Sequence, residues 1–312
     1  MSKSLRPQRL NEFIGQEQIK EVLQVAIDAA KKENRALDHI LLNGPPGLGK
    51  TTLARIIARE MGWKVKTTIG SSVKSAKDVR SLAFSISDKG KMIMFIDEIH
   101  RVGKPAQEVL YPILEDGIYH YKLGYSVTEF QLGPYTMIGA TTNMGKLEQP
   151  FVDRFVIQFQ LEYYSVNEML EVVMRSVDKL GMDIDMEAMM EVAARCRNTP
   201  RIANGILKRL RDYHSARGIK LTKINVRDIL WNKLHIDDLG LNQLDRRVLQ
   251  VLDNAIGPVG VQSIAAHVNE EADSVESKVE PFLLRLGLMD RIVRGRMITD
   301  AGRNHLENAI ST

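Results

Sequence analysis

The stretch LLNGPPGLGKTTLARIIAREM (residues 41–61) constrains the fold of this 312-residue chain more than any other segment. Within it, GPPGLGKT (44–51) fits the pattern G-x-x-x-x-G-K-[ST] between a predicted strand at 39–43 and a predicted helix at 50–61. Glycines in such a loop let backbone N–H groups approach phosphate oxygens, and the helix N-terminus adds the positive end of its dipole. We therefore predict a phosphate-binding loop; the alternative is a glycine turn beside a solvated lysine.

Two acidic residues after a second apolar run extend this prediction to a metal ion and a water molecule. Lys50 would reach the β- and γ-phosphates, and the hydroxyl of Thr51 would bind Mg²⁺. The run MIMFIDEIH (92–100) contains Asp97 and Glu98 at its polar end. Asp97 would lie at the carboxyl end of a strand and hold the water shell of the metal, and Glu98 would orient or deprotonate an attacking water. In a chain without the phosphate loop, such a pair would as often be a solvated turn.

Three further side chains are candidates for contact with the transferred phosphoryl group. Thr142 ends the third apolar run, YTMIGATTN (135–143), which we expect to lie next to the strand of Asp97. Arg154 and Arg201 would neutralise developing charge, and an arginine supplied by a neighbouring subunit would make hydrolysis depend on assembly. Each alone has a plainer interpretation, as a strand-end threonine or a salt-bridged surface arginine. His100 is given no catalytic role.

The composition is that of a globular protein in a reducing compartment. The single cysteine, Cys196, excludes an intrachain disulfide. No apolar stretch approaches the ~18 residues of a membrane span, and the N-terminal segment lacks the apolar part of a signal peptide. We therefore expect a cytoplasmic protein. The net charge is only +4, and residues 237–312 hold 8 Lys and Arg against 12 Asp and Glu, so a nucleic-acid surface would need clustered basic residues.

The order of predicted elements divides the chain into three parts. Up to about residue 160, strands alternate with helices, which is typical of an α/β fold with a parallel sheet covered on both faces. Residues 117–133 are predicted to form a projecting β-hairpin. Only helices follow, at 165–180, 185–197, 200–217 and 223–234. We expect a nucleotide-binding domain at 1–160 and a helical domain at 161–236.

A third domain is predicted at 237–312. Helices at 242–255, 261–268 and 272–286 precede two short strands around Gly295, which is the element order of a winged helix. Arg291, Arg294 and Arg296 fall within six residues at this second hairpin. At a hairpin tip they would bind DNA phosphates without reading sequence. The alternative is an exposed basic turn without a ligand.

Taken together, these segments resemble the AAA+ ATPases, and among them the RuvB family of bacterial Holliday junction branch-migration motors. The resemblance spans almost the whole chain, and its most specific parts are LYPILED, TPRIAN and the winged-helix segment. The segments are LRPQRLNEFIGQEQ (5–18), residues 36–62, FIDEIHR (95–101), EVLYPILED (108–116), YTMIGATT (135–142), NTPRIANGILKRLRDY (198–213), LGLNQLDRRVL (239–249), residues 257–291 and RGRM (294–297).

The resemblance implies a role for each matching position. It implies an AAA+ P-loop αβα domain, a helical lid and a winged helix, with ATP and Mg²⁺ as ligands. The residues it implies are Leu5, Arg6 and Tyr164 around the adenine, Gly47, Gly49, Lys50, Thr51 and Thr52 in the phosphate loop, Asp97 and Glu98 as the Walker B pair, Thr142 as sensor 1, Arg154 as the trans-acting arginine finger, Arg201 as sensor 2, and Arg291, Arg294 and Arg296 at DNA. It further implies a hexameric ring around duplex DNA at four-way junctions.

Two departures from the family pattern concern interfaces. The family normally has an arginine two residues before the finger, where this chain has Val152. The hairpin at 117–133, which in the family docks on the junction-binding adaptor RuvA, is shorter than usual and more aromatic, with Tyr119, Tyr121, Tyr125 and Phe130. The sequence of residues 71–91 also differs from the family pattern. These changes would fit a divergent member of the family, such as a phage or mobile-element copy with its own adaptor.

The function that we expect is that of an ATP-driven DNA translocase, a DNA-dependent ATPase that drives branch migration. A second hypothesis is an ATP switch of the clamp-loader or initiator type, which uses the same core to load another protein. A third is a winged-helix regulator that senses nucleotide, which would protect a specific DNA sequence. Sustained DNA-stimulated turnover distinguishes the motor from both.

Overall fold

The computed structural model describes residues 4–87, 91–123 and 126–310. The chain forms two compact units. The first runs up to Val172 and includes Thr199–Arg201, and the second comprises Val173–Asn198 and the chain from Ile202 onward. Among the helices of the described residues, none is both long enough and apolar enough to span a membrane.

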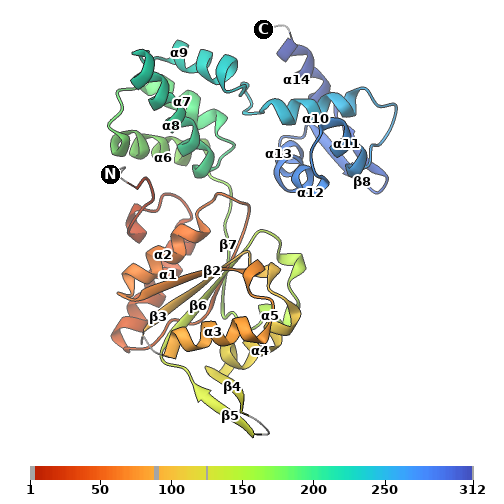
Figure 1. Ribbon diagram of the computed structural model, residues 1–312. Helices are drawn as coiled ribbons and strands as arrows, with labels where there is room; N and C mark the ends of the chain where they lie inside the picture. The colour runs from red at the N-terminus through yellow and green to blue at the C-terminus, as the bar shows by residue number, and fades with distance from the viewer. Residues whose placement is uncertain (1–3, 88–90, 124–125, 311–312) are drawn as a thin grey trace. The chain divides into compact units, whose positions relative to one another are not determined.

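A five-stranded parallel sheet forms the centre of the first unit (Figure 1). Its strands are, in spatial order, β2 (Lys64–Ile69), β3 (Met92–Asp97), β6 (Tyr135–Thr141), β1 (Ile40–Asn43) and β7 (Ile157–Gln160). The predicted adjacency of the second and third apolar runs is confirmed, because Ile96 pairs with Gly139 across β3 and β6. Since all strands run in one direction, their carboxyl ends meet at a single edge of the sheet.

Helices cover both faces of this sheet (Figure 1). On one face lie α1 (Glu17–Lys32) and α2 (Lys50–Glu60), and on the other lie α3 (Ala76–Ser87), α4 (Lys104–Asp116) and α5 (Gln149–Val152). Side chains alternate along a strand, so β3 sends Met92, Met94 and Ile96 into the cluster of α3 and α4. Burial on both faces explains why β3 is an almost uninterrupted apolar run.

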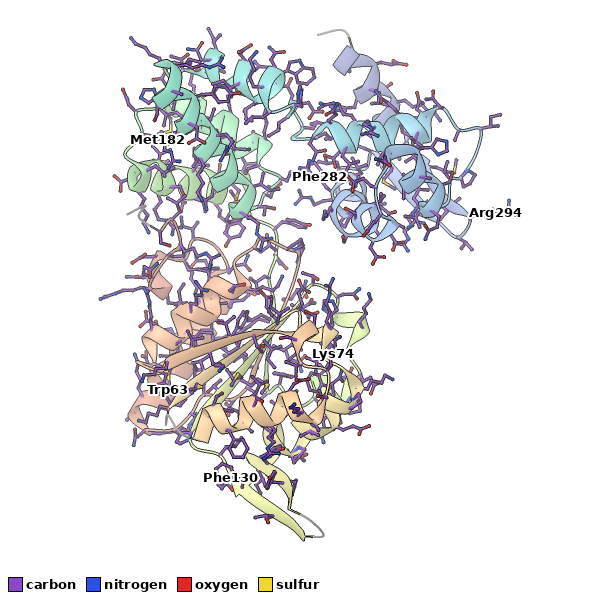
Figure 2. The ribbon with its side chains drawn as sticks, viewed as in Figure 1. Trp63, Lys74, Phe130, Met182, Phe282 and Arg294 are labelled. Carbon is purple, nitrogen blue, oxygen red and sulfur yellow. The ribbon has the colours of Figure 1, made fainter. Side chains whose placement is uncertain are left out.

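The hairpin predicted at 117–133 is present and consists of β4 (Ile118–Leu123) and β5 (Ser126–Gln131). It follows α4 directly and projects from the sheet (Figure 1). Phe130 (labelled in Figure 2) packs against Phe84 of α3, with ring centroids 5.8 Å apart and ring planes tilted by 53°. Tyr125, one of the aromatic residues noted in the sequence, lies outside the described residues.

The second unit begins with helices. The helices here are α6 (Val166–Leu180), whose first turns belong to the first unit, α7 (Met186–Arg195), α8 (Pro200–Arg217) and α9 (Lys223–Asp228), which continues as a π-helical turn at Ile229–Lys233. They match the four predicted helices within a few residues. Ser176 of α6 donates a hydrogen bond to Asn204 of α8 at 2.7 Å, which joins two of them.

The remaining elements form the predicted winged helix. They are α10 (Gln243–Asp253), α11 (Val261–Val268), α12 (Ala272–Ser274), α13 (Glu280–Arg285), β8 (Met289–Ile292), β9 (Gly295–Ile298) and α14 (Asp300–Ile310). The helix expected at 272–286 contains a π-helical turn, Val275–Val279. Pro281 explains it, because a proline ring clashes with the carbonyl four residues earlier and the wider turn relieves the clash. Helix α14 was not predicted.

Candidate nucleotide-binding site and wing

The loop between β1 and α2 has a backbone that only glycine adopts easily. Gly44, Gly47 and Gly49 all have positive φ, at 141°, 87° and 107°. A Cβ on Gly47 would lie 2.5 Å from Thr199 Cγ2, and a Cβ on Gly49 would lie 2.9 Å from the ring of Phe13. Conformation and neighbours therefore both require glycine, and the resulting loop can present its N–H groups to phosphate.

Lys50 lies at the start of α2 with its ammonium group turned onto this loop. Its Nζ donates hydrogen bonds to the carbonyls of Gly44 at 2.5 Å and Pro45 at 2.9 Å, and the residue is only 7% exposed. Burial lowers the pKa of Lys50 from 10.5 to about 8, although the nearby carboxylates of Glu98 and Asp97 oppose that shift. A buried cation beside a glycine-rich loop is suited to an anionic ligand.

Asp97 joins the phosphate loop to the end of β3. The hydroxyl of Thr51 donates a hydrogen bond to Asp97 Oδ2 at 3.2 Å. These two side chains were predicted to share a Mg²⁺ ion, and the structure brings their oxygens together at the carboxyl edge of the sheet. Oxygen ligands of this kind suit Mg²⁺, which usually takes one or two of them from the protein and the rest from phosphates and water.

Glu98 is held in a defined position by Thr142, which follows β6, and by His100, which lies in the turn after β3. Thr142 donates a hydrogen bond to Glu98 Oε2 at 3.0 Å, and His100 Nδ1 lies 3.3 Å from the same oxygen. His100 Nδ1 is also 2.9 Å from the hydroxyl of Thr141. Burial lowers the pKa of His100, which favours the neutral ring. These contacts restrict the carboxylate of Glu98 to few orientations beside the phosphate loop.

The backbone at Glu98 adds a second constraint. Its φ is +50°, a left-handed conformation that costs a non-glycine residue about 1 kcal/mol. Gly70 makes this conformation possible, because a Cβ there would lie 2.3 Å from the carbonyl oxygen of Glu98. Gly70 belongs to no motif, so its support of Glu98 could not be predicted from the sequence.

Two other predicted residues, Arg201 and Tyr164, lie against the loop. Arg201, at the start of α8, packs beside Gly47, whose added Cβ would lie 3.2 Å from Arg201 Cβ. Its positive charge also contributes to lowering the pKa of Lys50. The hydroxyl of Tyr164 donates a hydrogen bond to the carbonyl of Leu48 at 3.3 Å. Leu5 is buried, whereas Arg6 is exposed. Thr52 follows Thr51 on α2 and is half-buried.

Arg154 makes its contacts away from the phosphate loop of its own chain. It donates hydrogen bonds to Glu115 Oε2 and to the carbonyl of Pro150, both at 3.0 Å, and its guanidinium lies 5.2 Å from the ring centroid of Tyr111. Val152, two residues earlier, is buried in the apolar cluster of α3 and α4. The residue that replaces the expected arginine therefore contributes to the core.

The three arginines of the wing differ in their surroundings, which corrects the expectation that all three lie at a hairpin tip. Arg294 is exposed in the two-residue turn between β8 and β9 and projects from the end of the wing (Figure 2). Arg291 lies on β8, opposite Arg296 on β9. Arg296 is buried and bonded to Glu280 and Glu276, each at 2.7 Å. It therefore fixes the wing to the preceding helix.

Three family models match successive parts of this chain. Residues 5–161 match the Holliday junction DNA helicase RuvB P-loop domain, residues 164–237 match the RuvB AAA lid domain, and residues 238–307 match the RuvB C-terminal winged helix domain. The chain belongs to the RuvB family. Because this is a family of P-loop ATPases, nucleotide binding is a property of the chain.

Individual RuvB proteins are similar to this chain over nearly its full length. The Holliday junction branch migration complex subunit RuvB of Leuconostoc mesenteroides subsp. mesenteroides is 44% identical over 312 residues, covering 98% of this chain and 88% of the relative. The same subunit of Synechococcus sp. (strain RCC307) is 42% identical, covering 98% of this chain and 90% of the relative. The solved structure of the Thermotoga maritima RuvB Holliday junction branch migration motor matches with a TM-score of 0.87 at 38% identity, covering 97% of this chain and 98% of that one.

Proposed function

We propose that this chain is the motor subunit of a Holliday junction branch migration complex. It is a DNA-dependent ATPase that moves duplex DNA, and the curated relatives carry the name of that complex. The observation that carries the proposal is the joining of loop and sheet edge through Thr51–Asp97 and Glu98–Thr142. This arrangement can hold a triphosphate and position a water against its terminal phosphate.

The residues around the loop would divide the work of ATP hydrolysis. Backbone N–H groups from Gly47 to Thr51 would bind the phosphates, with Lys50 at the β- and γ-phosphates. Thr51 and Asp97 would hold Mg²⁺, which supplies charge neutralisation between the phosphates when it is bound. Glu98 would orient and deprotonate water while Thr142 keeps the carboxylate in place. Tyr164, Leu5 and Arg6 would line the adenine pocket.

Arginines would complete the site from two sources. Arg201 lies beside Gly47 and would act on the phosphates bound by its own chain. Arg154 makes contacts with α4 and Pro150 and would act on the nucleotide of a neighbouring subunit. A hexameric ring supplies such neighbours, so hydrolysis would depend on assembly. Conformational change between the domains, passed around the ring, would pull the duplex.

The proposal also assigns the domain boundaries and the binding partner of each part of the chain. Matches to separate P-loop, lid and winged-helix models support boundaries near residues 160 and 236. The winged helix would contact duplex DNA at the junction, and the 117–133 hairpin would dock a RuvA-like adaptor. We also infer that the protein works in the cytoplasm, where its DNA substrate lies.

A mixing experiment tests the proposed motor. Wild-type protein should dissociate a synthetic Holliday junction with ATP, with and without a candidate adaptor, whereas Lys50→Ala and Arg154→Ala should each be inactive. Mixing the two variants should restore some ATP hydrolysis, because one interface in a mixed ring has an intact loop facing an intact Arg154. Absence of rescue would count against an arginine acting in trans.

The time course of ATP hydrolysis distinguishes the proposed motor from the alternative, an ATP switch. A clamp-loader or initiator type of switch predicts one burst of hydrolysis for each partner loaded, and no strand exchange at a four-way junction. A motor predicts sustained hydrolysis that duplex DNA stimulates. Absence of affinity for adenine nucleotides in the presence of Mg²⁺ would overturn both proposals.

A further inference from the structure

Two carboxylates of the winged helix face the arginines of the wing. Glu276 and Glu280 lie one turn apart, and both reach across to β8 and β9. Glu280 is 2% exposed and binds Arg296 through two hydrogen bonds, of 2.7 and 3.2 Å. Glu276 is 38% exposed and lies at the edge of the same cluster. The helical segment that packs on the wing thus carries one exposed acid, Glu276, and one buried acid, Glu280.

Arg291 is the loosely held member of this cluster. It is 56% exposed, and its guanidinium nitrogens lie 3.6 Å from Glu276 Oε1 and 3.5 Å from Glu280 Oε2. These separations exceed the usual length of a charge-assisted hydrogen bond, which is about 2.7–2.9 Å. Exposure and distance together make these ion pairs weak enough for another anion to replace them.

We propose that Glu276 is a built-in competitor of DNA phosphate for Arg291. The inference rests on the proposed function, because it assumes that the wing contacts duplex DNA. A phosphate that binds Arg291 competes with Glu276, the exposed carboxylate of the two, so this pair subtracts from the affinity of the wing without removing the arginine. Glu276 thereby sets the strength of the DNA contact.

The role suits a protein that moves along DNA. Each phosphate contact adds to affinity, and all of them must be released before the next step. A carboxylate within reach of Arg291 offers that side chain an alternative partner at the moment of release. Arg294, exposed in the turn, remains available as the first contact.

Glu276→Gln tests the proposal with little risk to the fold, because Arg296 keeps both hydrogen bonds to Glu280, and an amide oxygen at position 276 can still accept the hydrogen bond from Arg296. The measurement is duplex binding by fluorescence anisotropy across a salt series, using full-length protein and a 30-base-pair duplex. We expect the Kd to fall about two- to fivefold, which is the equivalent of one partly exposed ion pair. The slope of log Kd against log salt concentration should steepen by up to about one unit.

Asp290→Asn is the matched control. Asp290 precedes Arg291 on β8, so adjacent side chains point to opposite faces of the hairpin, and the substitution removes the same charge. It should change affinity less than Glu276→Gln. In an Arg291→Gln background, the effect of Glu276→Gln should disappear, whereas that of Asp290→Asn should persist.

The outcomes separate this inference from the proposed function. If Arg291→Gln and Arg294→Ala weaken binding while Glu276→Gln leaves the Kd and the salt slope unchanged, the competition is refuted and the DNA-binding wing stands. An equal gain for Glu276→Gln and Asp290→Asn would also refute it. If neither arginine variant changes binding, the wing is not the DNA contact, and both ideas fail.

Discussion

The hydroxyl of Thr142 donates a hydrogen bond of 3.0 Å to the carboxylate of Glu98, and so joins the ends of the neighbouring strands β6 and β3. Glu98 lies in a left-handed backbone conformation directly after β3. A carboxylate on such a short, strained connection has few rotamers from which it can reach a water molecule. The bond to Thr142 selects one of them.

Replacing Thr142 by valine should therefore reduce turnover without reducing affinity. Valine keeps the shape of the side chain and removes the hydroxyl, so Glu98 loses a positioning donor. We expect kcat for ATP to fall about tenfold or more, as for a displaced general base, while the Kd for nucleotide changes little. Thr142→Ser keeps the hydroxyl and should retain most activity. A valine variant with unchanged kcat would exclude this role for the hydrogen bond.

The pKa of Lys50 predicts how nucleotide affinity depends on pH. Burial holds this pKa at about 8, and a bound triphosphate favours the charged form and so raises it. Affinity should be constant below pH 8, where the free protein is already protonated. Above pH 8 binding must take up a proton, and affinity should fall by up to about tenfold per pH unit.

Titration of a fluorescent ATP analogue at several values between about pH 7 and 9.5 would measure this dependence. Lys50→Arg is the control, because a guanidinium stays charged throughout this range. Its affinity, even if weaker, should be nearly independent of pH. A similar slope in both proteins would assign the proton to another group.

Gly47 should be intolerant of a methyl group, unlike Gly205 of α8. Gly47→Ala combines a φ of 87° with a contact of 2.5 Å to Thr199. We expect it to lower the free energy of unfolding by about 1–3 kcal/mol and to weaken nucleotide binding at least tenfold, since the loop must shift. Gly205, in the exposed part of α8, meets nothing within 4 Å.

Gly205→Ala should instead raise the free energy of unfolding by about 0.5–1 kcal/mol, because glycine is a poor helix former. Chemical denaturation and nucleotide titration of both variants would check the contrast. Equal stability of the two alanine variants would mean that the loop relaxes without cost.

The sequence predicted the strands that carry the site and missed those at the sheet edges. Strands β3 and β6 are buried on both faces and appear as apolar runs. Strand β2 lies at one edge and exposes both of its lysines, Lys64 and Lys66, so no apolar pattern marks it. Charged residues protect such an edge from pairing with another chain. Strand β2 therefore lacks an apolar pattern because it lies at the edge of the sheet.

Within the candidate site, topology accounts for the side chains whose proximity could be predicted. Parallel strands end at one edge, and so Thr51, Asp97 and Thr142 could be brought together from sequence. Gly70 and Phe13 could not, because each matters through a tertiary contact that no local spacing announces. Arg296 was misplaced for a similar reason, since its burial depends on the distant Glu280.

A last prediction concerns the link between α3 and the hairpin of β4 and β5. Arg80 donates a hydrogen bond of 2.8 Å to the hydroxyl of Tyr121, and its guanidinium lies 4.2 Å from that ring centroid and 5.5 Å from that of Phe84. These contacts join α3 to the hairpin through a single arginine between two aromatic rings.

Arg80→Ala should release the hairpin without affecting the nucleotide site. Amides of β4 and β5 should exchange hydrogen faster, because a cation–π contact and a hydrogen bond are lost, while ATPase activity without an adaptor stays at the wild-type level. If the hairpin docks an adaptor, the adaptor concentration for half-maximal stimulation should rise. Arg80→Lys keeps the charge but not the planar group, and should give an intermediate result. Unchanged exchange in the alanine variant would show that the sheet pairing alone holds the hairpin.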